Sequence, residues 1–256
     1  MIQPIVAGGT PLTPTLRGLF PRTEGPNGET IFVHSPIWRK YDFIGDLIDD
    51  ELNVCLGSDA QAAGALSAGI QSGAIRLTSG NNSGTASDDI AMLNSGLNFK
   101  ASQGDVGMEV RLRMNTAITG GTMGVGFTDV LSSTGSTEEP SSIATATLTT
   151  NASDGLGLIF DTGATVKDWF AWGVKGDTDS IFTDTTYAPV ADTWEIIRVE
   201  LDKAGNGYIY RNGILIASQT AALTASVLLT PYVYVNATTT ASVVVDVDYF
   251  AMWGGR

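Results

Sequence analysis

The chain has 256 residues, of which 16% are charged, and its formal net charge at pH 7 is −13. Its 14 Lys and Arg residues are spread thinly. A surface that binds nucleic acid or an anionic membrane needs clustered basic side chains, so neither partner is expected. The single cysteine excludes an intramolecular disulfide. We expect synthesis and folding in a reducing cytoplasm, because residues 1–10 lack a secretory-signal pattern and no stretch reaches the roughly 18 apolar residues of a membrane-spanning helix.

Residues 1–40 differ in kind from the rest of the chain. They hold six of the nine prolines, and proline fixes φ and removes a hydrogen-bond donor, which predicts extended, irregular chain. Apolar residues nevertheless recur throughout the segment, as they do not in a disordered tail. We therefore predict an extended apolar arm over residues 1–40, lying either on its own domain or on another subunit. One β-sandwich domain is predicted over residues 41–256.

The domain begins with a less regular region. Residues 41–57 predict a short helical turn that leads into a strand at Leu52–Leu56. Residues 58–72 are rich in alanine, but Gly64 and Gly69 favour a loop over a helix. After that, strands and turns alternate steadily. The strands predicted before the C-terminal region are residues 73–78, 89–93, 97–99, 107–114, 123–128, 156–161 and 169–174, with a Ser/Thr/Glu/Pro loop at 131–142.

The clearest pattern lies at residues 193–217. Apolar and charged residues alternate from Trp194 to Asp202, and Asn212-Gly213 separates two later apolar runs. Asn-Gly between apolar runs is a strong hairpin signal, because both residues accept positive φ. We predict a strand meander with one buried and one solvated face, then strands at residues 228–235 and 242–253. The regular strand spacing predicts an all-β fold, a two-sheet antiparallel sandwich.

Few residues in the sequence favour catalysis. The only histidine, His34, lies in the proline-rich arm, whereas a histidine-dependent triad needs an oriented base on a rigid scaffold. Cys55 has no basic neighbour in sequence and is predicted to be a buried, inert thiol. A glycosidase needs two carboxylates facing one cleft. Glu109, Glu195 and Glu200 do not form such a motif, and Glu195 and Arg198 are expected to be solvated strand positions. The chain is therefore expected not to be an enzyme, and no cofactor is expected.

Two groups of carboxylates and a set of aromatic residues are candidate binding positions. Calcium could use oxygen ligands, but the first acidic group lacks EF-hand spacing, and the second alternates with apolar residues as on the polar face of a strand. Sugar binding would use exposed aromatic rings, although tryptophan in a sandwich is more often part of the core or an interface. The carboxylates are Asp42, Asp46, Asp49, Asp50 and Glu51, and then Asp246 and Asp248; the aromatic residues are Trp169, Trp172 and Tyr187.

The residues also resemble known proteins. The meander from Trp194 to Ala217, with the strands that follow it, resembles the C-terminal half of a concanavalin A-like (laminin G-type) jelly roll. More narrowly, segments across about residues 40–253 resemble an uncharacterised group of tailed-phage virion proteins. The segments are Tyr41–Asp46, Ile75–Gly80, Val125–Asp129 and Asp154–Asp161. These motifs are structural, and the arm lies outside them.

The resemblance implies a non-enzymatic virion structural protein. We expect a capsid decoration or cement protein that is made in the host cytoplasm and placed on the capsid surface. Its expected partners are the major capsid protein and copies of itself, with which it would form a homotrimer. Its arm would bury apolar side chains on a neighbour. The expected interface residues are Ile2, Ile5, Leu12, Leu16 and Phe20. The alternative is a carbohydrate-binding host-attachment module of a head or tail fibre, with a glycan as partner. A glycosidase-like depolymerase is a third hypothesis.

Overall fold

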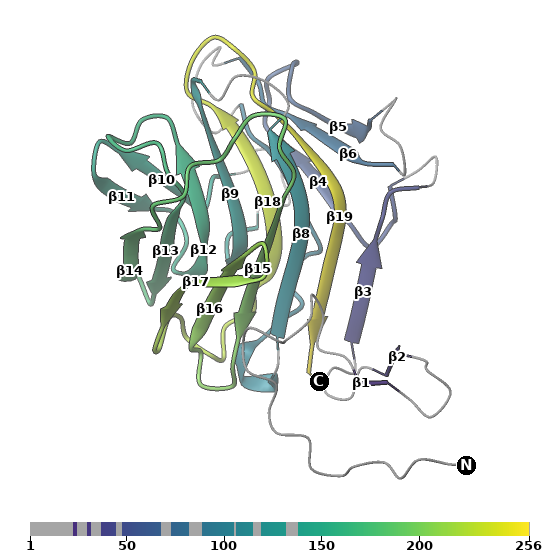
Figure 1. The fold of residues 1–256 in the computed structure, drawn as a ribbon, viewed down its shortest axis with the longest axis vertical. Coiled ribbons are helices and arrows are strands. Elements are labelled where there is room, and N and C mark those ends of the chain that lie inside the picture. Colours follow the sequence, from purple (N-terminus) through teal and green to yellow (C-terminus); the bar gives the residue numbers. More distant parts are fainter. Residues whose placement is uncertain are drawn as a thin grey trace.

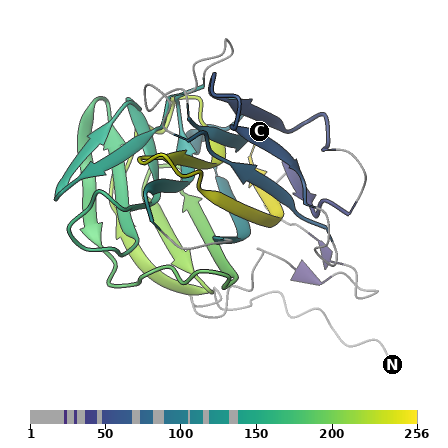
Figure 2. The same cartoon turned by 90° about the horizontal axis from the view of Figure 1, so that it is seen from above.

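The computed structural model describes residues 23–24, 30–31, 37–44, 48–67, 73–81, 89–104, 106–114, 119–131 and 138–255. Within this part of the chain, strands account for nearly all regular structure, apart from one 3-10 turn, η2 (Ala101–Gln103). Most strands belong to two large sheets that stack as layers (Figures 1 and 2). The predicted all-β, two-sheet antiparallel sandwich is therefore confirmed.

The first large sheet has seven antiparallel strands. A hairpin lies against its outer side and contacts β12 (Figure 1). This hairpin consists of β10 (Ser141–Ala144) and β11 (Thr147–Thr150). The strands of the sheet, in spatial order, are β14 (Thr178–Asp184), β13 (Phe170–Lys175), β12 (Asp154–Asp161), β9 (Gly121–Thr128), β18 (Thr230–Ala237), β7 (Ala91–Asn94) and β4 (Asn53–Leu56).

The second sheet is eight-stranded and holds the chain's C-terminal strand near its centre. Its strand β3 (Ile37–Tyr41) pairs with one end of β19 (Val244–Gly254), beside the path of the other seven strands. A separate two-stranded pair joins β1 (Thr23–Glu24) and β2 (Thr30–Ile31). The strands of the second sheet are β17 (Ile214–Gln219), β16 (Gly207–Arg211), β15 (Glu195–Leu201), β8 (Val106–Met114), β19 (Val244–Gly254), β6 (Ile75–Thr78), β5 (Ala63–Leu66) and β3 (Ile37–Tyr41).

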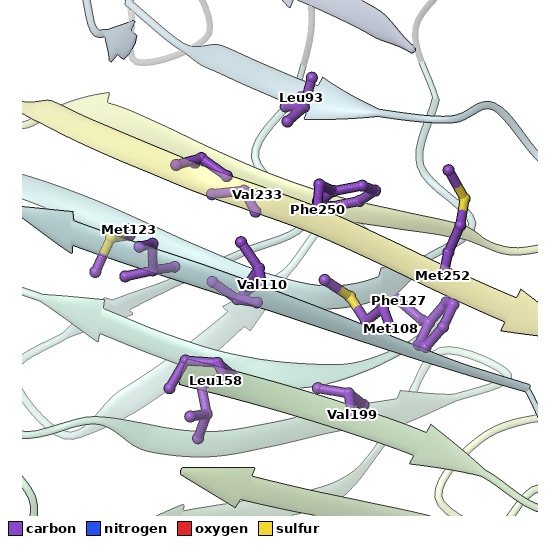
Figure 3. Close-up of a cluster of buried hydrophobic side chains, with 14 of the residues drawn as sticks. Leu93, Met108, Val110, Met123, Phe127, Leu158, Val199, Val233, Phe250 and Met252 are labelled. Atoms are coloured by element: carbon purple, nitrogen blue, oxygen red, sulfur yellow. The ribbon is translucent and has the colours of Figure 1, made fainter. Parts of the chain in front are cut away.

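The main core lies between the two sheets. Strand β8 shows how the sequence builds it, because its residues alternate between the two faces: Met108 and Val110 point into the core, and Glu109 and Arg111 point away. Val199 and Phe250 extend the apolar layer on the same sheet (Figure 3). Residues of the seven-stranded sheet close the core from the opposite side, and those labelled in Figure 3 are Leu93, Met123, Phe127, Leu158 and Val233.

Several predicted elements differ from the observed ones. The Ala-rich segment predicted as a loop contains β5, since Gly64 pairs with Leu77 and a backbone ladder needs no particular side chain. Residues 97–99 form a single bridge, Phe99 to Leu229, in place of the predicted strand. Strand β10 begins inside the predicted loop at 131–142. Strands β11 and β14 were not predicted, because their Thr- and Ser-rich runs lack a clear apolar alternation.

The predicted arm lies largely outside the described residues, and so do His34 and the expected interface residues. The boundary predicted at residue 40 falls within strand β3. This strand joins the eight-stranded sheet, where Trp38 is opposite Trp253 and Tyr41 is opposite Phe250. Tyr41 is buried in the main core, so the sandwich begins at least a few residues before position 41. The expected interface residues remain a prediction; they are Ile2, Ile5, Leu12, Leu16 and Phe20.

Candidate functional site

The outer side of the eight-stranded sheet carries a dense array of charged side chains, which we call the charged face. Strand pairing brings its residues together from six strands and the chain just before β15. One row crosses five strands as Lys40, Ala251, Glu109, Arg198 and Tyr210, each opposite the next. The members of the charged face are Lys40, Arg76, Glu109, Arg111, Arg113, Trp194, Arg198, Glu200, Tyr210, Asp246, Asp248 and Tyr249.

Asp246 anchors one end of the charged face. Arg76 Nε donates to its Oδ1 at 2.7 Å and Arg76 Nη2 to its Oδ2 at 3.0 Å. Arg113 adds a contact of 3.1 Å from Nη2 to Oδ2. The Asp246 side chain is fully buried, while both arginines remain partly exposed. One buried carboxylate therefore holds two guanidinium groups in fixed positions at the surface.

Trp194 connects this end to a second ion pair. Its ring lies 4.7 Å from the guanidinium carbon of Arg111 and 4.8 Å from that of Arg113, measured to the ring centroid. Arg111 Nη1 also donates to Asp248 Oδ2 at 2.7 Å. Cation–π contact restrains both arginines without neutralising them. Arg111 and Arg113 are therefore presented beside an aromatic ring as a preorganised pair.

Glu109 lies in the middle of the charged face and is fully buried. Burial raises the pKa of its carboxyl to about 7, while the hydrogen bond from Tyr249 and the charge of Arg198 oppose that rise. Tyr249 donates its hydroxyl to Glu109 Oε1 at 2.7 Å. Glu200 lies diagonally across the β8–β15 ladder from Glu109. Its Oε1 is 3.5 Å from Arg198 Nε. The two carboxyl groups thus face a shared arginine.

Two charged residues of β15 are buried, contrary to prediction. Glu195 and Arg198 were expected to be solvated, but only 3% and 2% of their surface is exposed. The guanidinium carbon of Arg198 stacks 4.1 Å from the ring centroid of Tyr210, which covers it. Glu195 points to the core side, where it accepts hydrogen bonds from Trp169 Nε1 at 3.0 Å and Arg211 Nη2 at 2.8 Å. Polar residues stay buried on both sides of β15 because each has a charged or aromatic partner.

The predicted aromatic sugar platform is also corrected. Trp169 and Trp172 are fully buried. Trp172 lies on the outer side of the seven-stranded sheet with Tyr232 and Tyr234, in a second cluster that the β10–β11 hairpin covers. The hairpin is held by the hydrogen bond from the Tyr234 hydroxyl to the Ser141 carbonyl oxygen. Of the three candidates, only Tyr187 is exposed, at 39%, with its ring centroid 5.0 Å from the Arg211 guanidinium carbon.

Those candidate calcium ligands that the structure describes are not assembled into a site. Asp246 and Asp248 bind arginines, as described above. Glu51 accepts hydrogen bonds from Arg39 at 2.9 Å and Tyr41 at 2.6 Å, and Asp42, Asp49 and Asp50 are exposed. Asp46 lies outside the described residues. Within the described residues, no three His, Cys, Asp or Glu side chains are grouped so that they could hold a metal ion.

Cys55 is half-buried rather than fully buried. Asn94 Nδ2 donates to its sulfur at 3.3 Å. It packs at the margin of the second cluster, on the edge strand β4.

No helix in the described part of the chain is both long and apolar enough to cross a membrane.

The charged face could not be recognised as a unit from local sequence pattern. The sequence pattern that marks it is charge at every second position: Glu109, Arg111 and Arg113 lie two residues apart on one strand. Asp246 lies between valines on another. Period two shows that such residues share a side of their own strand. It does not show that β6, β8 and β19 are neighbours, and that adjacency brings Arg76, Arg113 and Asp246 together.

Comparison with known proteins gives the fold family. No protein-family model matches the chain, and no curated protein matches its sequence. A protein of unknown function from Shewanella oneidensis MR-1 is similar in structure at TM-score 0.59 and 15% identity, over 87% of this chain and 88% of that chain.

Two further structures come from carbohydrate-related proteins. The catalytic domain of an endo-1,3-beta-glucanase (laminarinase) from Thermotoga petrophila RKU-1 gives a TM-score of 0.55 at 11% identity, over 86% and 99% of the two chains. The Emp47p carbohydrate recognition domain gives 0.53 at 14% identity, over 84% and 94%. The chain therefore has a concanavalin A-like, glucanase-type β-sandwich fold. At these identities the likeness concerns the fold alone.

Proposed function

We propose that the chain is a non-catalytic structural protein of a tailed-phage virion that decorates the capsid surface. The observation that carries this proposal is the charged face, where Arg76, Arg111 and Arg113 are fixed by aspartates and by Trp194. Preorganised side chains spread over a sheet suit a large partner, because they lose little conformational entropy on binding. The virion assignment rests on the sequence resemblance.

The engagement of the carboxyl groups supports a non-catalytic role. Glu109 is buried beneath its neighbours, Glu195 binds Trp169 and Arg211, and Asp246 binds two arginines. A glycosidase needs two carboxyl groups that reach a substrate from opposite sides of a cleft. The fold is nevertheless shared with a glucanase catalytic domain, so hydrolysis of β-glucans is the direct test of catalysis.

In the proposed mechanism, the arm supplies the affinity for the capsid and the charged face supplies the orientation. Apolar arm residues such as Ile5 and Leu16 supply binding free energy by burial on the major capsid protein or on a neighbouring copy. The charged face orients the sandwich on that partner, since electrostatic complementarity gives specificity more than affinity.

Co-sedimentation with phage heads that lack this protein tests the proposal. The wild-type chain should co-sediment with heads, and a chain lacking residues 2–30 should remain in the supernatant although its sandwich is folded. The double variant Arg111→Ser/Arg113→Ser should bind weakly. A matched control, Lys175→Ser/Lys203→Ser, removes the same charge from exposed positions elsewhere and should bind normally. A wild-type chain that ignores heads would overturn the decoration role.

A carbohydrate-binding module is the second candidate, and one observation favours it. Two aromatic residues that are not fully buried, Trp194 and Tyr187, each lie against arginines, and rings beside guanidinium groups can stack on a sugar and hold a carboxylate. Titration calorimetry with a neutral β-glucan and with a polyuronate tests it. Saturable binding that Trp194→Ala or Tyr187→Ala weakens would favour this function.

Hydrolysis assays address the third hypothesis. The wild-type chain and Glu109→Gln should both leave laminarin and other β-glucans intact. Release of reducing sugar by the wild type, abolished in Glu109→Gln, would show a glycosidase and contradict the non-catalytic proposal.

A further inference from the structure

Strand β17 differs from the other edges of the sandwich. It ends the eight-stranded sheet, and among the described strands it pairs with β16 alone, so its outward amide and carbonyl groups face away from the sheet. Natural proteins usually protect such an edge with charges, proline or short length. β17 has six residues, none of them charged and none of them proline.

The absence of charge extends well beyond the strand. No Asp, Glu, Lys or Arg occurs between Arg211 and Asp246, although the whole chain has a net charge of −13. At the start of β17, Ile214 is 59% exposed and Leu215 is 40% exposed. An uncharged edge with exposed aliphatic side chains thus lies on an otherwise acidic protein.

The other described edges are protected or short. Strand β14 contains Asp179 and Asp184, and β3 contains Arg39 and Lys40. Acidic residues 49–51 precede β4, and β5 has only four residues, with Gly64 among them. A partner strand would therefore meet charge or a short ladder at each of these edges.

We propose that β17 is a self-association surface, at which β17 of a second copy pairs antiparallel and joins two eight-stranded sheets into one. A second copy is the occupant favoured by charge, because two chains of net charge −13 repel each other wherever acidic surfaces meet, and the β17 edge avoids that repulsion. Pairing of identical edges makes a two-fold interface. The inferred dimer differs from the homotrimer expected from the sequence.

A bulge limits the length of this pairing. The β16–β17 ladder shifts register at Ile209/Tyr210, and Ile216, within the shift, packs against the main core. The residues beyond it, Ala217 to Gln219, continue in regular alternation. Such a contact is smaller than the roughly 1,600 Å² of a standard interface, so we expect a dissociation constant in the micromolar range.

Sedimentation equilibrium of the full chain tests the inference without any capsid component. The wild type should show a monomer–dimer equilibrium, and Leu215→Lys/Ser218→Lys, which places charges on the edge, should be monomeric. The control Thr183→Lys, an exposed position on the edge strand β14, should dimerise like the wild type. A monomeric wild type, or a charged β17 variant that still dimerises, would overturn the inference. This result does not depend on head binding, so it is distinct from the decoration test.

Amide exchange of the wild type provides a second measurement that needs no variant. In a free edge strand only alternate amides bond to the neighbouring strand, so the others exchange rapidly. In the dimer, consecutive amides from Ala217 to Gln219 should be protected, and dilution should remove that protection. Protection that persists in a monomer would show that another part of the same chain covers the edge, and would contradict pairing with a second copy.

Discussion

Glu109 is a carboxyl group that the fold removes from water although it points away from the main core. It accepts a hydrogen bond from Tyr249, and Arg198 lies opposite it on β15. These interactions favour the charged form, but burial outweighs them and raises the pKa of Glu109 to about 7 from its ordinary 4.5. Between pH 4.5 and about 7, the folded protein therefore keeps a proton on Glu109 that the unfolded chain has released.

This difference predicts a pH-dependent stability. As pH rises from 4.5 towards 7, the unfolded chain loses the Glu109 proton first, so the free energy of unfolding falls, in total on the order of 3 kcal/mol. Glu109→Gln cannot ionise, so it should resemble the wild type near pH 4, below the unfolded pKa, and be more stable than the wild type at pH 8. Urea unfolding at both pH values measures this. Glu138→Gln, at an exposed position, is the control; parallel wild-type and Glu109→Gln profiles would contradict the prediction.

The two aspartates of the charged face should differ in their contribution to stability. Asp246 is fully buried and binds two arginines, whereas Asp248 is partly exposed and binds one. We expect Asp246→Asn to lower the free energy of unfolding by about 2 kcal/mol, since hydrogen bonds between charged groups are lost. Asp248→Asn should cost less than about 1 kcal/mol, as exposed ion pairs do. Urea denaturation of both variants tests the order, and equal losses would show that burial of Asp246 is not decisive.

At the scale of elements, β9 and β12 approach each other unusually closely through glycine. Gly126 is opposite Gly157, and a Cβ atom at Gly126 would lie 2.2 Å from the Leu156 carbonyl oxygen and 2.6 Å from the Gly157 Cα. These contacts are with backbone, which cannot rotate away. β9 is the middle strand of the seven-stranded sheet, so the spacing between it and its neighbour β12 depends on this glycine pair.

Gly126→Ala should therefore disrupt this ladder. We expect a loss of about 3 kcal/mol in the free energy of unfolding, as for overpacking of a rigid interior. The control is Gly176→Asn in the β13–β14 turn, where an added Cβ meets nothing within 4 Å and asparagine tolerates the positive φ of 52°. Thermal and urea unfolding compare the two. A Gly126→Ala variant as stable as the control would mean that the strands can separate without cost.

The β10–β11 hairpin shows how an element can decide which residues are accessible. Strands β13 and β18 place Trp172, Tyr232 and Tyr234 on the outer side of the seven-stranded sheet. The hairpin covers them, and Ile143 N bonds to Asp161 Oδ2 at 2.8 Å to hold it there. Aromatic residues that alternation alone would leave on a sheet surface thus become a second core.

At the scale of the whole molecule, the net charge of −13 should control self-association through salt. Added salt screens repulsion between acidic surfaces, because the Debye length falls from about 10 Å at 0.1 M to about 3 Å at 1 M. Pairing through the uncharged β17 edge should therefore tighten as salt rises. Sedimentation equilibrium at low and high sodium chloride measures the change. If copies instead associated between the charged face and acidic surfaces, salt would weaken the dimer.

Much of the fold could be predicted from local pattern. The strand at residues 107–114 was predicted from period-two alternation, and it is β8; the hairpin at Asn212-Gly213 was predicted from turn chemistry, and it joins β16 and β17. Strand β5 was missed because its alanines and glycine carry no alternation, and its ladder with β6 supplies the pairing. The prediction that Glu195 and Arg198 are solvated was wrong because the side chains that cover them, such as Arg211 and Tyr210, come from other strands.

Local sequence pattern established the class of the molecule, because alternation, turn residues and glycine content act over a few neighbouring positions, and those are fixed by chain order. It also determined that an acidic chain carries an uncharged stretch from residue 212 to residue 245. The folded structure was needed to show that Arg76 and Arg113 share Asp246, that Glu109 is buried, and that β17 lies at an edge. These features arise because strand order and register join residues more than a hundred positions apart, and local pattern carries no information about which strands become neighbours.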